Sequence, residues 1–290
     1  MRGLGLALLL LLTLAGGPPA AAAPPLAVRL TPTAPRQGDI AFALVTGASG
    51  AREVEGSIDG RPISFFPYGE NWAAVIGIDL ETRTGKTPWR VGIIDAVGTV
   101  RTKAGTLTIR PRTFPVQQLT LPDHMVDLDP ESERRANAES ARLRTLYDTV
   151  SADRLWQGRF TRPVAVEGPG SGFGSRRVIN GKPRMPHSGT DWSAAQGTLV
   201  VAANRGRVAL VGDFFFAGRL VVLDHGLGLY TLYMHLDRVD VTEGVFIGRG
   251  ETLGTVGATG RATGPHLHFQ VQSRRARVDP ATLFALPVQD

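Results

Sequence analysis

The stretch Thr263-Gly264-Pro265-His266-Leu267-His268-Phe269, near the C-terminal end of the 290-residue chain, is the most informative part of the sequence for the fold. Apolar and polar residues alternate there, which predicts a β-strand over residues 266–271. Side chains two residues apart on a strand point to the same face, so His266 and His268 should lie on one side, about 7 Å apart along the chain. Leu267 should point into the core. Such a pair suits a metal site, but it also suits a structural or surface role.

A second histidine motif lies upstream, at His187-Ser188-Gly189-Thr190-Asp191. The spacing of His187 and Asp191 would fit one face of a helix, but Pro186 and Gly189 disfavour a helix, so we expect a loop that leads into a strand. Zinc binds imidazole nitrogen and carboxylate oxygen, and catalytic zinc sites typically have three protein ligands. Two histidines and one aspartate would satisfy that count. Spacing alone does not separate His266 from His268 as the ligand.

These two motifs belong to an ordered set of four. In chain order, the four motifs are Ser171-Gly172-Phe173-Gly174-Ser175-Arg176, then His187 to Asp191, then Tyr233-Met234-His235-Leu236, then Thr263 to Phe269. This set closely resembles the lysostaphin-like, or LytM-domain, peptidases that act on bacterial peptidoglycan, and the resemblance covers residues from about 160 to 280.

The resemblance implies roles for five residues. It makes His187, Asp191 and His268 the ligands of one zinc ion per catalytic domain, and His235 and His266 the catalytic residues. The implied activity is a zinc-dependent endopeptidase that hydrolyses peptide cross-links of peptidoglycan during cell-wall remodelling. The alternative is a non-catalytic cell-wall binding protein, or an activator of another murein hydrolase. The sequence leaves open which cross-link is cut and which of His235 and His266 is the general base.

The remaining histidines receive no part in this chemistry. His225 follows a predicted strand and precedes Gly226, which indicates a turn residue that helps to shape the fold. His124 lies in the predicted linker and is given no role.

The whole chain is expected to be mainly β. Short alternating runs separated by turn residues predict a small antiparallel β-sandwich over residues 24–113. Asp129-Pro130, followed by Glu131 and Glu133, predicts the start of a helix within a linker over residues 114–158. Residues 159–290 should form the all-β peptidase domain, for which the resemblance implies a LytM-type duplicated hybrid motif.

The first 23 residues predict a secretory signal peptide. Arg2 precedes an apolar run from Leu4 to Leu14, and small residues follow before Pro24. We therefore expect a periplasmic or secreted protein with no stable membrane anchor after cleavage, and an uncleaved anchor is the alternative. The chain has no cysteine, so it has no disulfide and no lipidated cysteine.

The charge balance and the domain order suggest partners. The 32 basic and 26 acidic residues give a net charge of +6, which favours anionic envelope polymers or serves solubility alone. The resemblance implies peptidoglycan as the partner, through its peptide stems and cross-links, whereas export argues against nucleic acid. Because a linker helix should join the N-terminal domain to the catalytic strands, we also expect intramolecular regulation in which that domain restrains the substrate groove.

Overall fold

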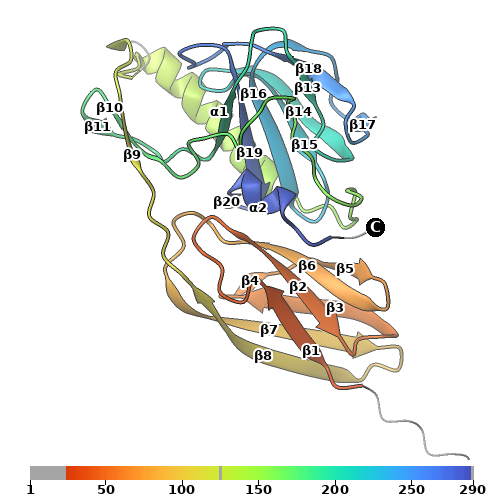
Figure 1. Ribbon diagram of the computed structural model, residues 1–290. Helices are drawn as coiled ribbons and strands as arrows, with labels where there is room; N and C mark the ends of the chain where they lie inside the picture. Colours follow the sequence, from red (N-terminus) through yellow and green to blue (C-terminus); the bar gives the residue numbers. More distant parts are fainter. Residues whose placement is uncertain (1–23, 124–125, 289–290) are drawn as a thin grey trace, which may run out of the picture.

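The computed structural model describes residues 24–123 and 126–288 of the chain. The predicted signal peptide and His124 lie outside the described residues. The chain is mainly β and forms two units that lie one above the other in Figure 1. Neither α1 nor α2, the helices of the described residues, has the length and the apolar character needed to span a bilayer.

The N-terminal unit contains two four-stranded antiparallel sheets, in the orders β1-β2-β6-β5 and β4-β3-β7-β8. Buried aliphatic side chains of β2 and β6 pack against Leu107 and Ile109 of β8, which closes the two sheets face to face. This is the small antiparallel sandwich that the alternating runs predict. Its strands are β1 (Ala27–Thr31), β2 (Ile40–Thr46), β3 (Ala51–Ile58), β4 (Arg61–Pro62), β5 (Phe65–Tyr68), β6 (Asn71–Gly77), β7 (Gly85–Asp95) and β8 (Val100–Ile109).

The segment expected to be a linker contains a strand that the sequence did not predict. Strand β9 (Val116–Leu119) pairs in parallel with β10 (Arg176–Ile179), and β10 pairs with β11 (Lys182–Pro183). The order of this small sheet is therefore β11-β10-β9. A four-residue strand with two central glutamines shows too little alternation to be recognised from its sequence.

The predicted helix is present as α1 (Pro130–Asp148). The side chain of Asp129 accepts hydrogen bonds from the backbone N–H groups of Glu131 and Ser132, at 2.9 and 3.0 Å. Pro130 occupies the first turn, where its missing N–H group has no cost. The start of the helix is therefore confirmed, for the reason that predicted it.

Helix α1 packs on the C-terminal strands. Tyr147 is buried among apolar side chains of three strands of the C-terminal sheet described below. Its ring lies 6.0 Å from the ring of Tyr230. Leu143 and Leu146 pack against the same cluster. The domain boundaries that we predicted stay predictions, but β9 and α1, within the predicted linker, both associate with C-terminal elements.

The C-terminal unit is built on a nine-stranded antiparallel sheet with the central order β12-β19-β16-β15-β14-β17; β18 joins β13 to β16, and β20 pairs with β19. Leu267, Phe269 and Tyr233 are completely buried in its core. Its elements are β12 (Gly189–Ser193), β13 (Leu199–Val201), β14 (Gly206–Phe214), β15 (Gly218–Asp224), β16 (Leu229–Val239), β17 (Phe246–Ile247), β18 (Thr252–Val256), β19 (His266–Ser273), β20 (Ala276–Val278) and α2 (Pro280–Phe284).

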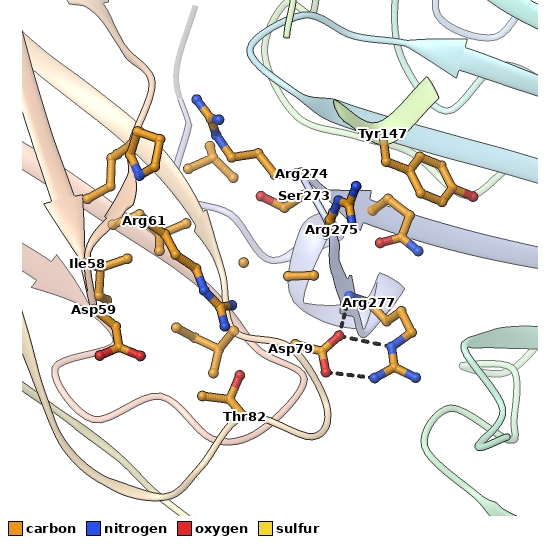
Figure 2. A pocket seen from close by; sticks show the side chains of 18 of the residues that line it. Ile58, Asp59, Arg61, Asp79, Thr82, Tyr147, Ser273, Arg274, Arg275 and Arg277 are labelled. Atoms are coloured by element: carbon orange, nitrogen blue, oxygen red, sulfur yellow. Dashed lines mark hydrogen bonds and ion pairs between the residues drawn. The ribbon is translucent and has the colours of Figure 1, made fainter. Parts of the chain in front are cut away.

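The two units meet along β20 and the residue that follows it. Arg277 donates to both oxygens of Asp79, at 2.8 and 2.9 Å (Figure 2), and to Glu81 at 2.7 Å. Arg112 donates to Asp279 at 2.7 Å. Beside these ion pairs lies a cleft of about 1390 Å³ that residues of both units line, and we call it the interdomain cleft.

Candidate metal centre and active site

Two neighbouring strands and one loop bring His187, Asp191 and His268 together. In the antiparallel pairing of β12 with β19, Asp191 lies directly opposite His268. His187 lies in the loop before β12, as the sequence predicts. Oδ1 of Asp191 is 2.8 Å from Nδ1 of His268 and 3.1 Å from Nε2 of His187, and the two nitrogens are 2.9 Å apart. The three atoms form a nearly equilateral triangle.

This triangle fits a metal ion. At zinc–nitrogen distances of about 2.0–2.1 Å, ligand atoms in tetrahedral geometry lie about 3.3 Å apart, which is close to the three distances in this group. His187 and His268 are buried, and Nδ1 of His187 has no hydrogen-bond partner among the described residues. The group of His187, Asp191 and His268 can therefore hold a metal ion.

The electrostatics of the group favour the ionised form of Asp191 and the neutral form of His268. Burial opposes ionisation of Asp191, but hydrogen bonds from His187 and His268 outweigh it and hold the pKa of this carboxyl well below its ordinary value. Burial lowers the pKa of His268, which favours the neutral imidazole. A carboxylate and neutral imidazoles are the protonation states that coordinate zinc.

The two remaining histidines of the predicted site lie beside this group. The ring of His235 is 4.7 Å from that of His266 and 6.0 Å from that of His268. Nε2 of His266 is 3.9 Å from Oδ1 of Asp191. The structure therefore brings together all five residues that the sequence analysis selected. His225 lies apart from them, in the turn after β15.

His235 owes its position to an irregularity in β16. Its φ of 62° lies in the left-handed region, which residues other than glycine rarely adopt. Pairing of β16 with β19 ends at Met234, and pairing with β18 begins at Leu236, so His235 lies where the strand changes partner. Its backbone N–H donates to the carbonyl oxygen of Ala217 at 2.8 Å. Unusual backbone geometry of this kind concentrates at functional sites.

Backbone carbonyls fix the tautomers of both histidines. Nδ1 of His235 lies 2.8 Å from the carbonyl oxygen of Thr259, and Nδ1 of His266 lies 2.8 Å from that of Gly264. Because a carbonyl only accepts, Nδ1 carries the proton in each ring, and Nε2 of the neutral ring is an acceptor. Burial, together with the charges of His268 and His266, lowers the pKa of His235 to about 3.

Sequence reasoning missed the residues that support the site. Thr259 and Gly264 act through backbone oxygens, which no side-chain pattern reveals. Ser188 donates to Gln270 at 2.8 Å and links the His187 loop to β19. A guanidinium nitrogen of Arg177 lies 3.8 Å from Asp191. Of these residues, only Arg177 could have been recognised from the sequence, because it is a basic residue directly after the motif Ser171 to Arg176.

Comparison with known proteins places these residues in one family. The model of Peptidase family M23 matches residues 185–280, which include all five. A crystal structure from Pseudomonas aeruginosa, described as a peptidase M23, is similar over both units. It is 30% identical with a TM-score of 0.63, and the match covers 87% of this chain and 96% of that one. The chain belongs to peptidase family M23.

Curated relatives match this M23 chain over part of its length. Peptidoglycan DD-endopeptidase ShyB of Vibrio cholerae is 40% identical over 111 residues, which are 38% of this chain and 26% of that protein. DD-carboxypeptidase/endopeptidase Mpg of Neisseria meningitidis is 40% identical over 104 residues, 36% of this chain and 24% of that protein. The matched part of the M23 chain thus spans about a quarter of the length of these relatives.

Proposed function

We propose that this M23 chain is a zinc-dependent endopeptidase that hydrolyses peptide cross-links of bacterial peptidoglycan. The main support is the triangle of His187, Asp191 and His268 with His235 and His266 beside it, inside the segment that matches the family. The name of ShyB, a peptidoglycan DD-endopeptidase, supports peptidoglycan peptides as the substrate class, and the name of Mpg supports endopeptidase activity. A substrate in the cell wall implies action in the periplasm or outside the cell, which agrees with the signal peptide predicted from the sequence.

We assign His187, Asp191 and His268 as the residues that hold the metal. Zinc bound there would supply Lewis-acid chemistry toward the scissile carbonyl and the attacking water. Hydrolysis joins the water oxygen to the carbonyl carbon, breaks the C–N bond and moves one proton from the water to the leaving nitrogen. The remaining task of the protein is to place the water and to move that proton.

We assign these two tasks to His235 and His266. A pKa of about 3 makes His235 a weak base, so at neutral pH its Nε2 accepts a hydrogen bond from the water and orients it. His266 has the same tautomer, and 17% of its side chain is exposed to solvent, so it can reach a substrate. We therefore assign to His266 the transfer of the proton from the water to the leaving amine.

A non-catalytic activator would be expected to have a degenerate or covered site. All five residues are present here, and 28% of the Asp191 side chain is exposed together with 17% of His266. Among the described residues, none covers the group of His187, Asp191 and His268 on the side where Asp191 and His266 reach the solvent. This observation favours the hydrolase.

The test uses the full chain and defined cross-linked muropeptides, with mass spectrometry of the fragments. We expect cleavage of a cross-link, loss of cleavage in excess chelator, and its return with zinc. Cleavage that persists after the metal is shown to be absent would contradict the zinc assignment. A metal-loaded protein that cleaves no cross-linked muropeptide, and yet stimulates another wall hydrolase, would instead support the activator.

A further inference from the structure

The interdomain cleft is larger than an ordinary small-molecule site. Its volume of about 1390 Å³ exceeds the roughly 300–1,000 Å³ of ordinary small-ligand sites. Its walls come from the β3–β4 and β6–β7 turns of the N-terminal unit, and from the end of α1 and the β19–β20 turn of the C-terminal unit. A cleft of this size between two units suits an extended ligand.

The acidic side chains of the cleft are mostly neutralised within the protein. Asp79 and Glu81 pair with Arg277, as Figure 2 shows for Asp79. Asp148 pairs with Arg275 at the end of α1. Asp59 is the one acidic lining residue, among those described, for which no cationic partner is present.

The basic side chains of the cleft, in contrast, outnumber the acidic side chains that could pair with them. Arg61, Arg83, Lys86 and Arg144 line the cleft and are exposed. None of the four has a hydrogen-bond or ion-pair partner in the described part of the chain. Figure 2 shows Arg61 extending from the N-terminal unit toward the residues of the C-terminal unit. The cleft therefore offers four free cations from both units against one free carboxylate.

One strand links the cleft to the candidate active site. Strand β19 begins at His266 and ends at Ser273, which lines the cleft, and the five residue steps from His268 to Ser273 span about 17 Å. Met185, two residues before His187, also lines the cleft, and it is 72% exposed. A chain molecule long enough to span this distance can contact both the metal group and the cleft.

We propose that the interdomain cleft binds the free carboxylates of stem peptides on a peptidoglycan strand, next to the peptide that is being cut. This inference rests on the proposed function, since it assigns the cleft to the same substrate. Peptidoglycan strands carry carboxylates at regular intervals, and guanidinium groups bind carboxylates with one or two hydrogen bonds. The cleft would hold the strand while the active site takes a neighbouring cross-link.

The test separates binding from cleavage and uses the full chain. In a His266→Ala background, we compare a cleft variant, Arg61→Gln/Arg83→Gln/Lys86→Gln/Arg144→Gln, with a control variant, Arg29→Gln/Arg52→Gln/Arg90→Gln/Lys103→Gln. The control removes the same number and kind of charges from exposed positions of the N-terminal unit outside the cleft. The probes are soluble, uncross-linked peptidoglycan strands with free or amidated stem carboxyls, and vesicles of phosphatidylglycerol.

We expect the cleft variant to bind strands with free carboxyls at least about tenfold more weakly than the parent, because it loses four exposed charge contacts. The control variant should bind these strands like the parent. Amidated strands should bind the parent as weakly as free strands bind the cleft variant. Binding should also weaken in 1 M salt, where the screening length falls to about 3 Å. Equal binding of free strands by cleft variant and parent overturns the inference, as does charge-dependent binding of vesicles without binding of strands.

A second measurement keeps the two proposals apart. With His266 intact, both quadruple variants should cleave a short cross-linked peptide dimer at the parent rate, because the dimer has no neighbouring stems. If the parent does not cleave the dimer but binds strands through the cleft, the proposed activity fails and the binding site stands. If the cleft variant alone fails to cleave the dimer, the four residues act on the catalytic site and the inference is overturned.

Discussion

Nε2 of His187 lies 2.9 Å from Nδ1 of His268, with Oδ1 of Asp191 within 3.1 Å of both. At this distance, only one of the two nitrogens can carry a proton directed at the other, because two N–H groups would repel. Two lone pairs that face a common centre are instead the arrangement of metal ligands. This relationship separates His187 and His268 from the two histidines that lie beside them.

The first prediction separates ligands from catalytic residues. Replacement of His187, Asp191 or His268 by alanine removes a ligand, so zinc content and activity should disappear together. His266→Ala and His235→Ala should keep zinc and slow turnover by about 10²- to 10⁴-fold, since they remove assistance to proton transfer. Atomic spectroscopy beside single-turnover cleavage checks all five variants. Loss of zinc in His266→Ala with zinc retained in His268→Ala would reverse the assignment within the pair.

The second prediction concerns the packing of Gly172 against His187. A methyl group on Gly172 would lie 2.4 Å from Nδ1 of His187, so Gly172→Ala should displace the imidazole and weaken zinc binding by about 10- to 100-fold. Gly168→Ala is the matched control. Both glycines have positive φ, of 96° and 84°, but the space around Gly168 is open. Zinc affinities measured by competition with a chelator should be lower for Gly172→Ala than for Gly168→Ala. Equal affinities would show that contact with His187 does not weaken zinc binding beyond the effect of backbone strain.

The third prediction concerns the contact between the two units. Asp79→Asn leaves the partly buried guanidinium of Arg277 without its two-oxygen partner, and it should lower the free energy of unfolding by about 1–3 kcal/mol. Asp148→Asn breaks the exposed pair with Arg275 and should have a smaller effect. Urea unfolding measures both. A larger loss for Asp148→Asn would show that the Asp79 pair does not contribute to the contact.

The fourth prediction concerns the buried His225. Its Nδ1 lies 2.8 Å from the carbonyl oxygen of Arg205, and its Nε2 lies 2.8 Å from the hydroxyl of Thr231. The Thr231 hydroxyl also lies within hydrogen-bond distance of the hydroxyl of Tyr233, at 3.0 Å. This network suits a neutral ring, and burial lowers the pKa of His225 to about 4.

Protonation of His225 should therefore destabilise the fold in acid. Between pH 6.5 and 4 the unfolded chain binds a proton at this position and the folded chain does not, so stability falls as the pH falls. From pH 7 to pH 5 the parent should lose about 2 kcal/mol more than His225→Gln, which has no titrating group there. Urea unfolding of both proteins at the two pH values measures the difference. Parallel losses would show that His225 does not titrate in this window.

The parts of the structure that the sequence predicted are those governed by local chemistry. Asp129 and Pro130 satisfy the first turn of α1 with their own side chains, so the start of the helix could be read directly. The period of a strand places His266 and His268 on one face without knowledge of the rest of the fold. The approach of Asp191 to His268 required the family resemblance, because these residues lie 77 positions apart and the pairing of β12 with β19 joins them.

The features that the sequence did not predict arise from contacts between distant segments. The left-handed backbone of His235 follows from a change of pairing partner within β16, and no feature of the residue itself signals it. Strand β9 exists because β10 lies beside it. The interdomain cleft depends on how two units meet, and the basic residues that line it come from four separate parts of the chain.

The parallel pairing of β9 with β10 has a consequence for the modular use of this protein. A fragment that began at residue 159, where the peptidase domain was predicted to start, would lack both β9 and α1. Strand β10 would then have an unpaired edge, and the apolar cluster around Tyr230 would be exposed to solvent. Both features favour aggregation. A transplantable catalytic module should therefore begin just before β9, at about residue 114, so that it carries its own edge strand and its own helical cover.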